Sequence, residues 1–441
     1  MSSYKKSLVF CFLLPFFIGC SNKTVEIENN NIKETEKIGF VEVKTKSFEL
    51  ENQYIILALE TENQKLYYDA RDFYFLLFER TNNYEYFTKY LTMLTQIKDY
   101  ELVRSQVLKY YLNNIKQEEL ILRLYTFALF KLDIQKEAVD NGEKLIKLFP
   151  NDINYELLGS VYLDQKNSLK AYEFFEKAFE MNKSVNTFFN LTNILYYNLA
   201  KKEEAVNKIE QYILLNGHDF NLSIQLLTFY EKEQKIDKIV PFLKEMYNEY
   251  KSNNEIMSLN KTKILLVKYL AKDSVSTAID FLEQNKEEDE VLLSLYKITN
   301  QPQKIYDLLE VLYLKSNNID YLAQQAIIQF EMSEDKKKVL NEVVMKFDRV
   351  LYNSDNHIYQ NYLAYILIDY DLNVRRGVSL VKKALEKDPK NIAFLDTLAW
   401  GEYKLKNCKE AFNQMKKVID EVGLDDEEIR THWQKIKECK K

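Results

Sequence analysis

The chain has 441 residues, enough for two or three globular domains or one long repeat array. Only 8 glycines and 5 prolines are present, so tight turns should be few, which argues against a β-sandwich or β-barrel and favours an all-helical chain. Hydrophobic residues make up 46% and charged residues 29% of the chain, which excludes a disordered chain. The net charge is −6 and no block of basic residues is present, which argues against nucleic acid as a partner.

Residues 1–19 have the organisation of an export signal. Two lysines precede an apolar stretch of twelve residues at 7–18, which is too short to cross a bilayer as a helix. The stretch ends at Gly19 and Cys20 and is followed by polar residues. This segment resembles the lipobox of bacterial lipoproteins. The resemblance implies cleavage after Gly19 and lipid attachment to Cys20, and an ordinary signal peptide with an incidental cysteine is the alternative.

The residues after Cys20 indicate in which membrane the lipid anchor would lie. Ser21 is not the aspartate that retains many such lipoproteins at the inner membrane, so an outer-membrane anchor with the chain facing the periplasm is expected, and surface exposure is the alternative. Residues 20–50 are polar and charged, which is typical of a flexible tether spanning roughly 30 Å. Apolar and polar residues alternate from Phe40 to Leu50, which favours a short strand-like arm.

From about residue 54 onward, one spacing of small and apolar residues recurs. Its clearest copy consists of Leu158, Gly159, Tyr162, Ala171, Phe175 and Ala178. This L-G-x2-Y-x8-A-x3-F-x2-A spacing resembles the tetratricopeptide repeat, which implies hairpins of two helices, A and B. Small Gly159 and Ala171 let the two helices approach closely, and Phe175 fills the space to the next hairpin.

The small residue of helix B serves as a marker of each repeat. The markers are Ala70, Val103, Ala138, Ala171, Ala205, Ile239, Ala278, Ile305, Val339, Gly377 and Ala411. Most steps between markers are 33 to 35 residues. A register held for this long predicts an all-α fold, a right-handed α-solenoid of about ten or eleven tetratricopeptide-like hairpins with a C-terminal capping helix.

The spacing between successive markers also divides the repeat array into segments. Residues 51–272 form the N-terminal repeats, and residues 301–424 form the C-terminal repeats. Between them, at 273–300, a 39-residue step is followed by a 27-residue step, which predicts a distorted hairpin or a shortened helix and a place where the array could bend. Residues 425–441 form the capping helix, whose acidic first turn suits the helix dipole.

Two cysteines lie in the last repeat and its cap. Cys408 should begin helix B, and Cys439 should end the capping helix. Because the two helices should be antiparallel and of similar length, the cysteines come to the same level and can form a disulfide in an oxidising compartment. Two free cysteines are the alternative.

No motif for catalysis or cofactor binding is found. The three histidines, His218, His357 and His432, are far apart and none has a cysteine or histidine neighbour at ligand spacing, so no metal site is expected. The phosphate-binding loop, the nucleophile elbow and the zinc-protease motif are all missing from the sequence. We therefore expect no enzyme, no catalytic residue, no cofactor and no small-molecule substrate.

In tetratricopeptide proteins the inner face of helix A lines a binding groove. Carried over repeat by repeat, the resemblance implies a groove of Phe127, Phe130, Leu163, Ile194, Tyr197, Glu231, Tyr365, Trp400 and Tyr403. Aromatic residues supply much of the binding energy at interfaces. The alternative is that several of these side chains only pack between repeats.

The two resemblances together predict a lipid-anchored periplasmic scaffold. It would bind protein partners of a cell-envelope complex that serves assembly or secretion or is associated with a motor, and it would contact the membrane through Cys20. An accessory lipoprotein of polysaccharide export is the first alternative. A peptidoglycan hydrolase or its activator is the second.

Overall fold

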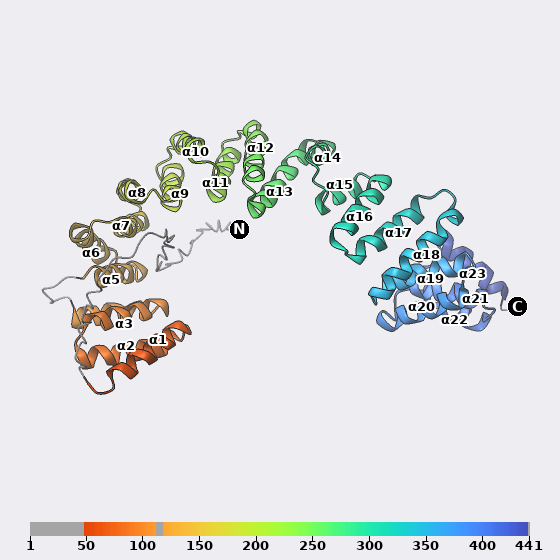
Figure 1. Ribbon diagram of the computed structural model, residues 1–441, viewed down its shortest axis with the longest axis horizontal. Coiled ribbons are helices and arrows are strands. Elements are labelled where there is room, and N and C mark those ends of the chain that lie inside the picture. The colour runs from red at the N-terminus through yellow and green to blue at the C-terminus, as the bar shows by residue number, and fades with distance from the viewer. Residues whose placement is uncertain (1–47, 112–117, 440–441) are drawn as a thin grey trace, which may run out of the picture. The chain divides into compact units, whose positions relative to one another are not determined.

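The computed structural model describes residues 48–111 and 118–439, which contain 23 α-helices, one π-helix and no strand (Figure 1). The prediction of an all-α solenoid of helical hairpins is confirmed. The leader at 1–19, Cys20 and all but the last three residues of the predicted tether lie outside the described residues. Residues 48–50 form a turn before the first helix, so this part of the predicted arm is not a strand.

The chain divides into two compact units, residues 1–134 and 135–441. In the first unit, consecutive helices pack as antiparallel neighbours around buried aromatic and aliphatic side chains. The helices of this unit are α1 (Glu51–Asn63), α2 (Tyr67–Thr81), α3 (Tyr84–Gln96), α4 (Tyr100–Tyr110) and α5 (Glu119–Lys131).

The second unit continues the array of helical hairpins and ends in α23, a single helix that packs on α21 and α22. Its first half comprises α6 (Gln135–Leu148), α7 (Asp152–Asp164), α8 (Ser168–Asn182), α9 (Val185–Asn193), the π-helix η1 (Ile194–Asn198), α10 (Lys202–Asn216), α11 (Phe220–Lys232), α12 (Ile236–Ser252) and α13 (Ile256–Asp273). Its second half comprises α14 (Val275–Gln284), α15 (Glu290–Ile298), α16 (Pro302–Ser316), α17 (Ile319–Met332), α18 (Lys336–Asn353), α19 (His357–Asp369), α20 (Val374–Lys387), α21 (Ile392–Lys404), α22 (Cys408–Val422) and α23 (Glu427–Cys439).

The sequence markers share one structural position. Each of the eleven markers is the fourth residue of an even-numbered helix, from Ala70 in α2 to Ala411 in α22. Ten of the eleven are buried. In the clearest repeat, a Cβ added to Gly159 would lie 2.8 Å from the Phe175 ring and 3.4 Å from the Ala171 carbonyl oxygen. The small residues therefore permit the close approach that was predicted for them.

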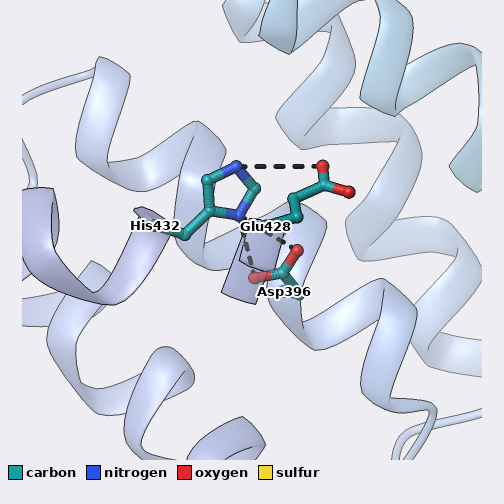
Figure 2. Close-up of side chains that lie close together, drawn as sticks. All are labelled: Asp396, Glu428 and His432. Atoms are coloured by element: carbon teal, nitrogen blue, oxygen red, sulfur yellow. Dashed lines mark hydrogen bonds and ion pairs between the residues drawn. The ribbon is translucent and has the colours of Figure 1, made fainter. Parts of the chain in front are cut away.

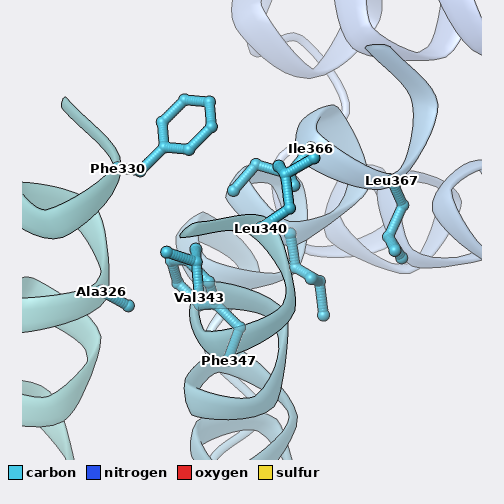
Figure 3. Close-up of a cluster of buried hydrophobic side chains, with 8 residues drawn as sticks. Ala326, Phe330, Leu340, Val343, Phe347, Ile366 and Leu367 are labelled. Carbon is cyan, nitrogen blue, oxygen red and sulfur yellow. The ribbon is translucent and has the colours of Figure 1, made fainter. Parts of the chain in front are cut away.

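The marker Val339 is the exception and was assigned one residue too early. Val339 is only partly buried, whereas Leu340 is 5% exposed and joins Val343 and Phe347 in the core between α17, α18 and α19 (Figure 3). Helix α18 has 18 residues, four more than α20. The buried side of α18 is set by the later residues Val343 and Phe347. As a result, its first buried residue comes one position later in the helix than in the other even-numbered helices.

Helix lengths account for the two irregular steps. The 39-residue step spans α12 and α13, which have 17 and 18 residues. The 27-residue step spans α14 and α15, which have 10 and 9 residues. A bend of the array at 273–300 stays a prediction.

The prediction that tight turns would be few is wrong. Among the described residues, 14 residues other than glycine have a positive φ, against two glycines. Lys65, Lys98, Lys166 and Lys406 each lie two residues before helix B begins. In the turn after α7, the backbone N–H groups of Lys166 and Asn167 bond to the last carbonyls of the helix at 3.0 and 2.9 Å. These bonds offset the cost of about 1–2 kcal/mol for each left-handed residue.

A polar link recurs between hairpins, which we name the Tyr–Glu–Lys link. In the link around Tyr230 of α11, the phenol donates to Glu210 Oε1 of α10 at 2.6 Å, and Lys238 Nζ of α12 donates to the same oxygen at 2.9 Å. The same positions carry Glu143, Tyr162 and Lys170 in α6–α8, and Glu283, Tyr296 and Lys304 in α14–α16. Burial pushes the Glu210 pKa upward, but hydrogen bonds from Tyr230 and Lys238 outweigh burial, so this pKa lies below its ordinary value.

The Tyr–Glu–Lys link gives a stability prediction with a pH signature. Tyr230→Phe removes one buried hydrogen bond and should destabilise α10–α12 by about 1 kcal/mol near neutral pH. Because the Glu210 pKa is lowered on folding, the carboxylate contributes stability above its unfolded pKa, and the contribution is lost as the pH falls through the folded pKa. The difference between wild type and variant in amide hydrogen exchange should therefore shrink at acid pH. Tyr352→Phe, at a position 90% exposed, is the control and should change nothing.

Candidate functional site

The predicted groove residues fall into separate groups. Phe127 and Phe130 lie on α5 in the first unit and are partly buried. The ammonium group of Lys131 lies 5.2 and 4.9 Å from the centroids of their rings. The remaining seven residues lie in the second unit, where Leu163, Tyr365 and Tyr403 are also partly buried.

A polar and aromatic surface runs over η1, α11 and α13, with Tyr197 exposed and Tyr269 partly buried, and we name it the tyrosine–lysine face. Tyr197 is 50% exposed, and Lys232 Nζ lies 4.4 Å from its ring centroid and 3.1 Å from its hydroxyl. On the next odd-numbered helix, the Tyr269 hydroxyl donates to Glu231, and Lys272 Nζ lies 4.3 Å from the Tyr269 ring centroid. Burial first, and then the bond to Glu231, raise the pKa of Tyr269 to about 12. The phenol therefore remains a hydrogen-bond donor at neutral pH.

Two residues predicted for the groove are not on the surface. Ile194 is 1% exposed, because the π-helical turn that it begins directs Ile194, Leu195 and Tyr196 into the core and leaves Tyr197 outside. Trp400 is 5% exposed, because the capping helix α23 covers it. Both are corrections to the predicted groove.

The contacts of Trp400 explain its burial. The indole ring stacks on the His432 ring of α23 with 4.2 Å between centroids, and on the Tyr403 ring at 5.0 Å. The indole Nε1–H donates to Asp369 Oδ1 at 3.1 Å. Lys404 Nζ donates to the backbone carbonyl of Asp369 at 2.9 Å and completes the contact between α19 and α21. Trp400 is therefore a packing residue between α19, α21 and α23.

A cluster of titratable side chains lies beside Trp400, and sequence reasoning missed it. His432 is 4% exposed, and its Nδ1 lies 3.1 Å from both carboxylate oxygens of Asp396 on α21 (Figure 2). On the other side of the ring, Nε2 lies 3.9 Å from Glu428 Oε1 (Figure 2). The spacing of Glu428 and His432, four residues apart on one helix, was the signal available in the sequence.

A tyrosine from a third helix reaches the cluster. Tyr365 of α19 lies close enough to Glu428 for the carboxylate charge to act on its phenol. Burial first, and then the charges of Asp369 and Glu428, raise the pKa of the Tyr365 phenol far above its usual range. Glu428 thus faces both a phenol and an imidazole.

The capping helix is fixed at its far end by a disulfide. Cys408, the first residue of α22, is bonded to Cys439, the last residue of α23, and their Cα atoms are 5.5 Å apart. Between these ends, Ile436 is 0% exposed and packs with Met415 and Val418 of α22. The disulfide and this apolar contact hold α23 against the last hairpin.

Among the helices of residues 48–111 and 118–439, none has the length and apolar content needed to cross a membrane. No protein-family model matches the chain, and no curated protein sequence is significantly similar to it.

Solved structures resemble the chain weakly. A tetratricopeptide repeat protein from Parabacteroides merdae is 16% identical with a TM-score of 0.38, and the alignment covers 56% of this chain and 98% of that one. The protein YrrB, described as a tetratricopeptide repeat protein with an unusual peptide-binding site, is 13% identical with a TM-score of 0.28 over 52% and 97%. The Naa15/Naa10 complex bound to HypK is 12% identical with a TM-score of 0.34 over 88% of this chain and 66% of that chain. At these values the similarities say nothing of what this chain binds.

Proposed function

We propose that this protein is a lipid-anchored scaffold at the outer membrane that binds protein partners of a cell-envelope complex from the periplasmic side. The observation that carries the binding role is the tyrosine–lysine face. The anchor rests on the sequence around Gly19 and Cys20, with about thirty residues of polar tether giving a reach of roughly 30 Å.

The tyrosine–lysine face has the chemistry of a protein-binding surface. Tyr197 and Tyr269 offer aromatic area with few rotatable bonds, so ordering them on binding costs little entropy. Lys232 and Lys272 add positive charge above both rings, and Glu231 adds an acceptor between them. The face lies on η1, α11 and α13, which belong to successive hairpins, so a helix or extended segment laid across them can contact several repeats at once.

Affinity purification after crosslinking in native membranes tests both parts of this proposal. The wild-type chain should recover one defined envelope complex. Cys20→Ala should lose the membrane location and the complex together, because the anchor sets where the scaffold meets its partner. The double variant Tyr197→Ala and Tyr269→Ala should keep the membrane location and recover at least tenfold less partner, since loss of two aromatic contacts costs about 1–2 kcal/mol or more.

The matched control is Tyr352→Ala, which removes a tyrosine that is 90% exposed on α18, away from the face. This variant should recover the complex as wild type does. Full recovery of the complex by the double tyrosine variant would exclude the tyrosine–lysine face. Full membrane retention of Cys20→Ala would exclude the lipid anchor. Recovery of polysaccharide-export subunits or of a peptidoglycan hydrolase would identify the corresponding alternative machine.

A further inference from the structure

We propose that Glu428 and His432 of the capping helix bind one divalent transition-metal ion, with Asp396 holding the imidazole in the orientation that binding requires. Zinc is the ion that this donor pair suits best, since zinc takes imidazole nitrogen and carboxylate oxygen together. This inference does not rest on the tyrosine–lysine face or on the lipid anchor.

The first argument is the charge around the His432 ring. A neutral imidazole has one N–H donor and one lone pair. Nδ1 lies 3.1 Å from both oxygens of Asp396, which can only accept, so in the neutral ring Nδ1 carries the proton and donates to Asp396. The lone pair on Nε2 then faces the carboxylate of Glu428 at 3.9 Å (Figure 2). Either a second proton on the ring or a metal ion bound to Nε2 can offset the repulsion between these two electron-rich groups.

The second argument is geometry. Residues four apart lie on one face of a helix, so Glu428 and His432 can bind the same ion. Zinc lies about 2.0–2.2 Å from such donors, and two donors of one tetrahedral ion are roughly 3.3 Å apart. The present 3.9 Å is close to this separation. The Glu428 side chain is 51% exposed and can rotate to close the gap, and water can reach the ion to complete its coordination.

The third argument is the support behind the histidine. An imidazole that binds a metal through one nitrogen usually donates its other N–H to a carboxylate. Asp396 is 8% exposed and occupies that position, while Trp400 stacks on the ring and fixes its plane.

Two lysines lie on the Trp400 ring, which stacks on His432. The nearby cations Lys404 and Lys435 lie over the Trp400 ring, at 5.3 and 5.0 Å from its centroid. The two lysines are thus placed on the indole and not between Glu428 and His432.

Metal binding should also hold the capping helix in place. An ion at Nε2 withdraws electron density from the ring and strengthens the Nδ1–H bond to Asp396. This bond joins α23 to α21, so occupancy should slow amide hydrogen exchange in α23. The ion would then act on the same helix that the Cys408–Cys439 disulfide fixes at its far end.

The test is zinc titration of the full chain, followed by calorimetry and by metal analysis after gel filtration. Cys11→Ser and Cys20→Ser are included and the disulfide is kept oxidised, so that no thiol competes for zinc. We expect one zinc ion per chain, with binding lost in His432→Gln and weakened at least tenfold in Glu428→Gln. Asp396→Asn should weaken binding by 10- to 100-fold, because it supports the ligand without touching the ion.

Two matched variants serve as controls. Glu427→Gln removes the neighbouring carboxylate in the first turn of α23, and His357→Gln removes a histidine on α19. Both should bind zinc as wild type does, and circular dichroism confirms that each variant is folded. The proposal is overturned if the oxidised wild-type chain binds no zinc, or if His432→Gln binds it equally well. Histidine NMR gives a second readout, because protonation of both ring nitrogens of His432 in excess zinc would also exclude the site.

Discussion

Replacing Phe347 with alanine should cost about 3–5 kcal/mol, the range found when a fully buried phenylalanine is truncated. Phe347 is 0% exposed, and its ring stacks on Tyr362 with 5.4 Å between centroids. It belongs to a core that α17, α18 and α19 build together (Figure 3). Because three helices share this core, the loss should open two neighbouring hairpins and not α18 alone.

Hydrogen exchange measured segment by segment is the suitable readout for Phe347→Ala. A repeat array need not unfold in one step, so a single melting temperature would average over several hairpins. Exchange should accelerate in α17–α19 and stay unchanged in α7–α12. Met345→Ala is the control on the same helix, since Met345 is 65% exposed, and it should change stability by less than about 0.5 kcal/mol. Equal effects of the two substitutions would contradict the assigned face of α18.

Removing the Cys408–Cys439 disulfide should destabilise the C-terminal end by roughly 3–4 kcal/mol in the chain-entropy model. The bond closes a loop with a sequence separation of 31 residues and joins the start of α22 to the end of α23. In the double variant Cys408→Ser and Cys439→Ser, α23 should lose protection from exchange first. His432 should then leave Trp400, and the tryptophan emission should shift to longer wavelength as the indole becomes exposed.

Chemical reduction of the wild-type chain gives an independent check of the disulfide prediction. It should reproduce the exchange pattern of the double serine variant, whereas reducing the serine variant itself should have no further effect. A cap that keeps its protection after both treatments would show that the Ile436 contacts alone hold α23. Ile436→Ala separates the two contributions, because it removes the apolar contact and leaves the covalent bond.

The repeat register could be predicted because it depends on local periodicity. A small or aliphatic residue at the fourth position of helix B is demanded by the close approach to helix A. At Gly377, for example, an added Cβ would lie 2.9 Å from the Ala364 carbonyl oxygen. The same periodicity fails for Val339, since the rotation of a long helix is decided by which of its several apolar residues pack best. The positions of Cys408 and Cys439 at helix ends also follow from local patterns.

The contents of the candidate sites depend on contacts that the sequence does not display. Trp400 was assigned to an open groove, but α23 covers it through a ring 32 residues further along the chain. Asp396 and His432 are 36 residues apart and meet only because α21 and α23 pack together. Ile194 was misplaced because a π-helical turn changes which residues face inward. Each of these depends on the relative rotation of two helices, which a pattern within one helix does not determine.

The polarity of the links between hairpins has a consequence for the order of the repeats. In the Tyr–Glu–Lys links, the glutamate lies on α6, α10 or α14 and the tyrosine on α7, α11 or α15. In the hairpins at the C-terminal end, Lys382 of α20 takes the place of the glutamate, and Glu402 of α21 takes the place of the tyrosine. Lys382 and Glu402 are 2.7 Å apart, and Glu402 is 3% exposed. A chimera that placed the α21–α22 hairpin after α10 would bury Glu402 against Glu210, two carboxylates with no cation between them. The hairpins are therefore not interchangeable. Variants in which their order is changed should fold only where the residues at each new junction carry complementary charges.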